Sequence, residues 1–277
     1  MDDRQIIGAH PIDPAVRMRI MACLLELEER YDVTVLFACE SGSRGWGFAS
    51  PDSDYDVRFI YVNRLSWYLK VEAGRDVIEQ PISDILDVSG WDLRKALQLL
   101  RGSNPTLLEW LHSPIVYREG SPAAPWLRAL AQENFSKARC YQHYVSSAKS
   151  VYREHLLGED VSYKKYLYAL RPLVAARWIR EGRGMAPMPF AELVQATIED
   201  PALIGEINRL VQAKMGAIES ATTRRWNAIH DFIERELASA EAHTFPTQDR
   251  PDRDALDVFL RETILENETR RRKGAMP

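Results

Sequence analysis

Residues 33–62 of the chain read VTVLFACESGSRGWGFASPDSDYDVRFIYV, and they carry its strongest structural signal. The first part, Val33–Cys39, is short and rich in β-branched and aromatic residues, which is typical of a buried strand. The middle part is rich in Gly, Ser and Pro, and it is predicted to form a loop. The last part, residues 54–62, is predicted to be a second strand. Its alternate residues fall on opposite faces, so Asp54, Asp56 and Arg58 share one face.

A Gly-Ser pair and two carboxylates stand at the ends of the predicted loop. Gly42 and Ser43 follow the first strand, where glycine allows a close backbone approach and backbone N–H groups can hold a phosphate. Asp54 and Asp56 project from one face, and neighbouring carboxylates repel each other unless a divalent cation neutralises them. Oxygen ligands without His or Cys suit Mg²⁺ or Mn²⁺. The pattern predicts two-metal phosphoryl or nucleotidyl transfer. The alternative is a loop whose Asp and Ser residues only cap turns.

A third carboxylate is expected, because two-metal transfer usually needs one to hold the second metal. The candidates are Glu79, Asp84 and Asp87. Asp87 is flanked by apolar residues in a strand pattern, where an acid is costly without a partner. Asp84 begins the same strand and is the second choice, because a turn or cap role suits it better. We therefore assign Asp87 to the metal site.

The rest of the chain is predicted from its periodicity. Residues 14–31 form a helix, two short strands lie within 76–82 and 84–88, and helices follow over 91–101 and near 106–112. Beyond residue 122 only helical patterns occur: 123–133, 135–157, 161–181, 201–219, 223–242 and 252–270. Strands followed by helices predict the α+β class. We expect a mixed-sheet domain over 1–120 and an all-helical domain over 121–277.

The charge of the chain is uneven. Its 36 basic and 40 acidic residues give a net charge of −4, which argues against a general nucleic-acid coat protein. Residues 134–190, however, hold 10 basic and 4 acidic side chains. No apolar run is long enough for a membrane span, and the N-terminus lacks a recognisable leader. Three cysteines are too few for a disulfide framework, so a cytoplasmic location is expected.

Two arginines lie close to the predicted site. Arg44 follows the Gly-Ser pair and is a candidate for the β- and γ-phosphates of a nucleoside triphosphate, since Arg suits bidentate phosphate contacts. The alternative for Arg44 is a plain surface arginine. Arg58 shares its strand face with the two aspartates. It either faces the substrate or forms an ion pair with those carboxylates.

Three further polar residues lie on one predicted helix face. Lys164, Tyr168 and Arg171 are spaced i, i+4 and i+7, which places them side by side. A buried face does not normally carry Lys and Arg, so this face is predicted to meet water or an anion. Asn104 lies in a Ser-Asn-Pro turn between two helices. It is predicted to cap a helix, with a contact to the sugar as the alternative.

Three blocks of the sequence resemble one family. They are ESGSRGWGFASPDSDYDVRFIYV, DVSGWDLRKALQLLRGSNPTLLEWLHSPIVY and KKYLYALRP, which together span roughly Val35 to Pro172. They resemble RlaP, nucleotidyltransferases of the DNA polymerase β superfamily that are linked to RNA ligase-associated repair. The resemblance implies a polymerase-β-like mixed sheet with Gly42 and Ser43 at the triphosphate. It also implies that Asp54, Asp56 and Asp87 bind two metal ions, and it favours a triphosphate or RNA backbone as the anion near Lys164 and Arg171.

The expected activity is Mg²⁺-dependent transfer of a nucleoside monophosphate from a nucleoside triphosphate to an acceptor hydroxyl, with Mn²⁺ as a possible substitute. Two metal ions are expected, and pyrophosphate is released. The expected acceptor is an RNA 3′ end, with an RNA ligase pathway protein as a partner and no membrane. One alternative acceptor is a protein side chain or a small molecule, as in toxin–antitoxin or antibiotic-modifying systems. Another alternative is a nucleotide-binding regulator without turnover.

Overall fold

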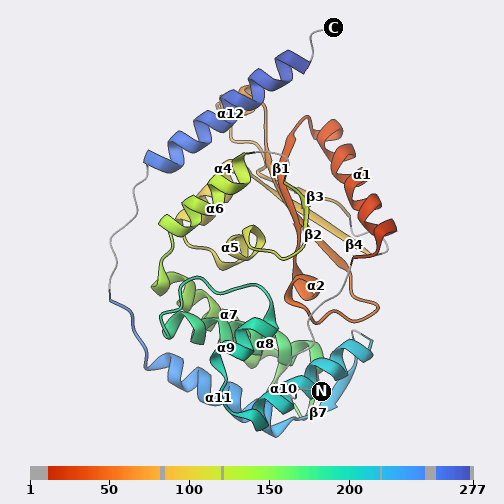
Figure 1. The fold of residues 1–277 in the computed structure, drawn as a ribbon, viewed down its shortest axis with the longest axis vertical. Helices are drawn as coiled ribbons and strands as arrows, with labels where there is room; N and C mark the ends of the chain where they lie inside the picture. Colours follow the sequence, from red (N-terminus) through yellow and green to blue (C-terminus); the bar gives the residue numbers. More distant parts are fainter. Residues whose placement is uncertain (1–11, 82–84, 120–121, 219, 247–253, 275–277) are drawn as a thin grey trace. The chain divides into compact units, whose positions relative to one another are not determined.

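The structure is a computed structural model that describes residues 12–81, 85–119, 122–218, 220–246 and 254–274 (Figure 1). The described residues form two compact units. The first, here called the sheet unit, comprises residues 12–41, 54–135 and 254–274. The second, the helical unit, comprises residues 42–53 and 136–246. Each unit combines segments that are far apart in the sequence. The boundary expected at residue 120 would instead divide the chain at a single point. That boundary stays a prediction about independent folding.

The sheet unit is built on a five-stranded mixed sheet with the strand order β3-β4-β2-β1-β5. The strands are β1 (Thr34–Glu40), β2 (Tyr55–Val62), β3 (Val77–Glu79), β4 (Leu86–Asp92) and β5 (Val116–Arg118). β2 and β4 are parallel, and the other neighbours are antiparallel. The first two strands therefore match the sequence prediction, whereas the predicted loop between them contains a short helix, α2 (Gly42–Trp46).

Helix α1 (Pro14–Tyr31) covers one face of this sheet. The Asp13 carboxylate accepts a hydrogen bond from the backbone N–H of Ala15, which caps the helix at its predicted start. Its buried stripe packs against the inward face of β2, where the side chains alternate as expected. The stripe consists of Val16, Ile20, Leu24 and Leu27.

The other helices of the sheet unit follow the strands. They are α3 (Leu65–Tyr68), α4 (Leu93–Arg101), α5 (Pro105–Leu111), α6 (Ala123–Glu133) and α12 (Asp254–Gly274). Figure 1 shows α4 and α6 on the side of the sheet opposite to α1. β4 continues past Gly90 to Asp92, so the helix predicted from residue 91 begins at Leu93. A Cβ atom on residue 90 would lie 2.3 Å from the ring of Phe59, which is too close for two carbon atoms. Only glycine therefore fits at this position.

The helical unit confirms the predicted helical pattern with additions. Its helices are α2 (Gly42–Trp46), α7 (Lys137–His155), α8 (Tyr163–Arg180), α9 (Phe190–Thr197), α10 (Pro201–Gly216) and α11 (Asn227–Glu241). Two short strands, β6 (Asp160–Ser162) and β7 (Thr222–Arg224), form an antiparallel pair, so this part of the chain is not purely helical. No described helix has the length and apolar character that a membrane crossing requires.

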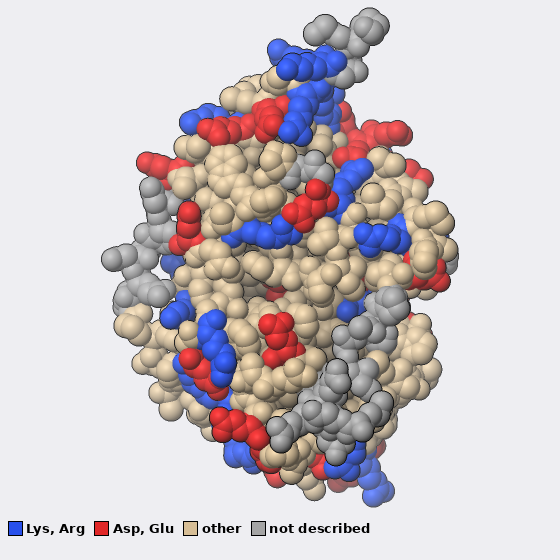
Figure 2. Space-filling view, viewed as in Figure 1, with Lys and Arg blue, Asp and Glu red and all other residues tan. Residues whose placement is uncertain are grey.

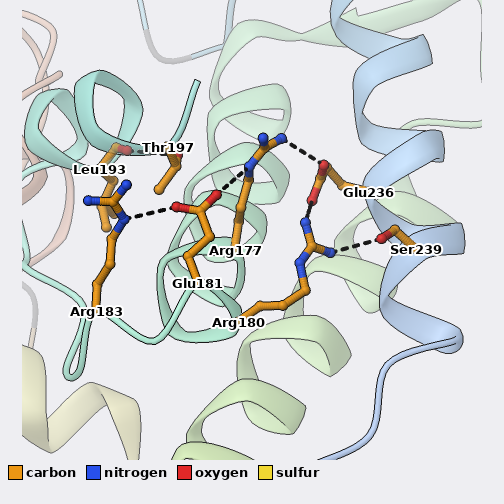
Figure 3. Close-up of polar contacts among 8 residues, drawn as sticks. All are labelled: Arg177, Arg180, Glu181, Arg183, Leu193, Thr197, Glu236 and Ser239. Carbon is orange, nitrogen blue, oxygen red and sulfur yellow. Dashed lines mark hydrogen bonds and ion pairs between the residues drawn. The ribbon is translucent and has the colours of Figure 1, made fainter. Parts of the chain in front are cut away.

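An ion-pair network joins α8 to α11 within the helical unit (Figure 3). Glu236 on α11 accepts hydrogen bonds from Arg177 and Arg180 on α8, each at 3.0 Å. Glu181 accepts from Arg177 at 3.0 Å and from Arg183 at 2.8 Å. The network fixes the register of α11 against the most buried helix of the unit, α8.

Candidate active site

Two of the three predicted carboxylates lie opposite each other on parallel strands. The pairing of β2 with β4 aligns Asp56 with Asp87. The guanidinium of Arg58 lies between their side chains, with Nη2 at 2.8 Å from Asp56 Oδ1 and 2.7 Å from Asp87 Oδ2. Its Nη1 donates to the backbone carbonyl of Asp87 at 2.8 Å. Of the two roles considered for Arg58, the structure therefore shows the ion pair with the carboxylates.

The carboxylates of Asp56 and Asp87 form a cation-binding environment, since together they already hold the guanidinium of Arg58. Their oxygen donors match Mg²⁺ or Mn²⁺. Asp54, the third acid, immediately precedes β2 and is exposed. Within the described part of the chain, no three acidic, His or Cys side chains are arranged closely enough to hold a metal ion. A divalent ion bound by Asp56 and Asp87 would thus have to displace Arg58 or share its position.

A buried glutamate that the sequence pattern did not reveal fixes the backbone at this site. Glu40 ends β1 and is fully buried. Its Oε1 accepts from the backbone N–H of Asp56 at 2.9 Å, and its Oε2 accepts from the Tyr117 hydroxyl at 2.5 Å. Burial, together with the Glu40 charge, raises the pKa of Tyr117, so this hydroxyl remains a donor. The sequence did contain one indication of this role, because a charged residue ends an otherwise apolar strand.

The Gly-Ser pair begins the short helix α2 in the helical unit. Gly42 has φ +55°, in the left-handed region that favours glycine. The carbonyl of Ser43 accepts from the backbone N–H of Phe48 at 2.9 Å, and Ser43 and Arg44 are both buried. Arg44 donates to the carbonyl of Ser53 at 2.8 Å, so it joins the two ends of the loop. Its contact with a triphosphate remains a prediction.

A buried lysine holds the end of the same loop. Lys214 on α10 is 1% exposed, and its Nζ lies 2.6 Å from Ser50 Oγ and 3.4 Å from Ser53 Oγ. Ser53 is joined by a peptide bond to Asp54, so Lys214 restrains the residue just before the predicted metal ligand. The sequence did not predict this role. The signal was its spacing, because Lys214 continues the buried stripe of Leu203, Ile207 and Leu210.

The predicted basic face of α8 forms one aromatic and cationic group. The Arg171 guanidinium lies 5.0 Å from the Trp46 ring centre, and the Tyr168 ring lies 5.2 Å from the same ring. Lys164 Nζ lies 5.5 Å from the Tyr168 ring centre. Arg171 is buried, whereas the sequence predicted that this face avoids burial. Cation–π contacts with Trp46 and Tyr144 compensate for the loss of water around its charge.

Three other candidates have local structural roles or cannot be placed. Asn104 caps α5 as predicted, since its Oδ1 accepts from the backbone N–H of Leu107 at 3.2 Å. Glu79 on β3 forms an exposed ion pair with Arg75. Asp84, the second choice for the third acid, lies outside the described residues.

The predicted site residues therefore fall into two groups. Asp54, Asp56, Arg58 and Asp87 belong to the sheet unit. The phosphate-binding candidates belong to the helical unit: Gly42, Ser43, Arg44, Lys164, Tyr168 and Arg171. Peptide bonds at residues 41–42 and 53–54 connect the two groups. The first group has the donor chemistry of a cation site, and the second has the chemistry of an anion site.

Comparisons with known proteins give the family of the chain. A family model described as "RlaP: RNA repair pathway DNA polymerase beta family" matches residues 16–262. The "Uncharacterized protein YcgL" of Bacillus subtilis (strain 168) is 45% identical over 222 residues, which cover 80% of this chain and 85% of that protein. The crystal structure of a nucleotidyltransferase-like protein from Exiguobacterium sibiricum 255-15 aligns over 92% of this chain and 91% of its own. Its TM-score is 0.33 at 12% identity, which is too low for an argument from structure.

The family match covers most of the chain and includes the Gly-Ser pair, all three predicted acids and the α8 face. The chain therefore belongs to the RNA repair pathway DNA polymerase β family, RlaP, and is a nucleotidyltransferase.

Proposed function

We propose that this enzyme transfers a nucleoside monophosphate from a nucleoside triphosphate to the 3′ hydroxyl of an RNA, with Asp54, Asp56 and Asp87 as the divalent-metal ligands. The observation that carries the proposal is the alignment of Asp56 and Asp87 around one cationic group. Strand pairing fixes the two carboxylates at neighbouring positions, and such a pair is stable as anions only beside a cation. Family membership supports the class of reaction.

The proposed reaction is an in-line displacement. The acceptor hydroxyl loses its proton to solvent water and its oxygen bonds to the α-phosphorus, while the bond from that phosphorus to the bridging oxygen breaks and pyrophosphate leaves. Bound Mg²⁺, or Mn²⁺, supplies charge neutralisation and lowers the pKa of the acceptor hydroxyl. Two ions are proposed, because three carboxylates can hold two metal ions when some of the carboxylates bind both.

The other residues of the chain bind and orient the substrate in this proposal. Gly42 and Ser43 hold the phosphates through backbone N–H groups. Arg44, Lys164 and Arg171 provide positive charge for the triphosphate or the RNA backbone. Glu40 and Lys214 act as positioning residues, because they fix the backbone of Asp56 and the hydroxyl of Ser53.

The carboxylate roles are tested by measuring pyrophosphate release from labelled triphosphate in Mg²⁺. Asp54→Asn combined with Asp56→Asn is expected to lower the rate at least about 10³-fold, and Asp87→Asn should also lower it strongly. Glu79→Gln is the matched control, because Glu79 lies in the same sheet and forms an exposed ion pair with Arg75. Full activity of the double variant, or equal losses in Asp87→Asn and Glu79→Gln, would contradict the assignment.

The acceptor is tested separately with RNA that carries either a 3′ hydroxyl or a 3′ deoxy end. Label transfer only to the hydroxyl form supports the proposal. Label on protein, or on small hydroxyl compounds but not on RNA, would replace the RNA acceptor and leave the transfer chemistry intact. An added RNA ligase of the same pathway should then seal or extend the modified end.

A further inference from the structure

Helix α1 is apolar on two of its sides. One side carries the buried stripe that packs against the sheet. The side that faces away from the sheet carries Ala15, Met18, Ala22 and Leu25, and all four are exposed. Met18 is 69% exposed and Leu25 is 51% exposed. A surface helix normally has a single apolar stripe, so the second one is available to a partner.

The exposed apolar residues of α1 follow the spacing of a coiled-coil seam. Ala15, Met18, Ala22 and Leu25 are separated by three, four and three positions, which aligns them along the helix. Apolar residues scattered singly over a surface are normal, but these four form one continuous row. We call this row the outer seam of α1. Glu29 takes the next position of the pattern, so the outer seam ends before it.

Two opposite charges border the outer seam on the same flank. Arg19 directly follows Met18, and Glu26 directly follows Leu25. Within the part of the chain that the structure describes, neither side chain forms an ion pair or a hydrogen bond. They are seven positions apart, about 10 Å along the helix, which is too far for them to pair with each other. Figure 2 shows uncharged surface between side chains of both signs where Figure 1 places α1.

The order of these charges fits a second copy of the same helix. If two copies of α1 pack antiparallel about a two-fold axis near Ala22, Met18 of each lies beside Leu25 of the other. Arg19 of each then lies beside Glu26 of the other, so two ion pairs form. Parallel packing would instead place like charges together, Arg19 beside Arg19 and Glu26 beside Glu26. The charges therefore favour the antiparallel arrangement.

We propose that this chain forms a two-fold symmetric dimer in which the outer seams of α1 pack antiparallel, with Arg19 paired to Glu26 of the second copy. A groove of about 560 Å³ borders the Arg19 and Glu26 flank and reaches β4, so a second copy can cover more than the helix alone. One pair of helices is a small interface, and we expect a dissociation constant of about 1–100 µM.

The proposal is tested by sedimentation equilibrium of the full chain across that concentration range. Arg19→Glu and Glu26→Arg should each weaken the dimer at least about tenfold, because each places like charges together at both ends of the interface. Both substitutions in one chain should restore the dissociation constant to within about threefold of the wild type, because the pairs are only reversed. An equimolar mixture of the two single variants should form a heterodimer, since every pair then joins opposite charges.

Two further variants separate the interface from general effects of charge and folding. Glu72→Arg makes the same change of charge as Glu26→Arg at an exposed position outside α1, and it should alter dimerisation by less than about twofold. Met18→Glu should prevent dimerisation, while its circular dichroism spectrum stays that of the wild type because this side chain is exposed. A wild type that is monomeric throughout the range, or a double variant no tighter than the single ones, would overturn the proposal.

Discussion

Arg58 determines how the two paired carboxylates are stabilised. Its position on the polar face of β2 follows from strand alternation and was predicted. Its bond to Asp56 lies within β2, whereas its bond to Asp87, 29 positions away, depends on the parallel pairing of β2 with β4. The guanidinium offsets one of the two carboxylate charges. A divalent ion at the proposed metal site would compete with Arg58 for the same oxygens.

We predict that Arg58→Met destabilises the metal-free protein and strengthens its response to Mg²⁺. In EDTA the free energy of unfolding should fall by about 1–3 kcal/mol, because two half-buried carboxylates lose their shared cation. Added Mg²⁺ should then raise the Tm of the variant more than that of the wild type. Chemical denaturation with and without Mg²⁺ measures both effects.

Arg64→Met is the control for this prediction, since Arg64 pairs with the exposed Asp32. It should cost less than about 1 kcal/mol and leave the Mg²⁺ response unchanged. An Arg58→Met protein as stable as the wild type in EDTA would show that the guanidinium does not offset carboxylate repulsion.

Single residues were predictable where their neighbours are close in sequence. Asp54 and Asp56 stand out because alternation places both on one face. Glu40 and Lys214 were missed because their roles depend on distant partners. Lys214 meets Ser50 across 164 positions, and Glu40 meets Tyr117 across 77. Sequence spacing indicates that such a side chain is buried, but it does not identify the group that compensates its charge.

At the scale of elements, long periodic helices were predicted better than short strands. The helix expected over 123–133 is α6 with the same bounds, and α7 and α8 begin within two residues of their expected starts. Strands of three residues, such as β5 and β6, have no period to detect. They exist because distant strands complete their hydrogen bonds, which no local pattern shows.

The ion-pair network between α8 and α11 gives a prediction for element packing (Figure 3). Glu236→Gln should lower the free energy of unfolding by about 1–3 kcal/mol, because Glu236 is only 11% exposed and bonds two arginines. Glu241→Gln on the same helix is the control. Its carboxylate pairs with Lys149 but is 63% exposed, so solvent screens the pair and the free energy of unfolding should stay almost unchanged. Equal effects in urea denaturation would mean that burial does not strengthen the network.

At the scale of the whole molecule, the last helix belongs with the first strands. Glu268 on α12 accepts from the backbone N–H of Leu65 at 3.0 Å, and Arg271 bonds Asp32. Phe259 is fully buried, with its ring 4.7 Å from that of Trp126. The sequence predicted α12 as a helix but placed it in the second domain. Amphipathic spacing shows which face is buried, and it does not show what covers that face.

We predict that a chain ending at residue 246 loses stability in the sheet unit in particular. Removing α12 uncovers the surfaces that bury Leu256, Phe259 and Ile264, each worth about 1.5–3 kcal/mol. That loss is comparable to the whole stability of a typical domain, about 5–15 kcal/mol. Amide hydrogens of β1, β2 and β4 should then exchange much faster, while those of α8 stay protected, because α8 packs within the helical unit.

The same packing argument predicts that a synthetic peptide of residues 254–274, added in excess, restores slow exchange in the strands. A fragment ending at residue 120 should be destabilised for the same reason, and it also lacks α6, which contacts β1. Unchanged exchange in β2 after removal of α12 would mean that residues 12–135 fold without it. The fragment ending at residue 120 would then decide the boundary. Slow exchange in its strands would support an independent domain over 1–120, and fast exchange would mean that the sheet also needs α6.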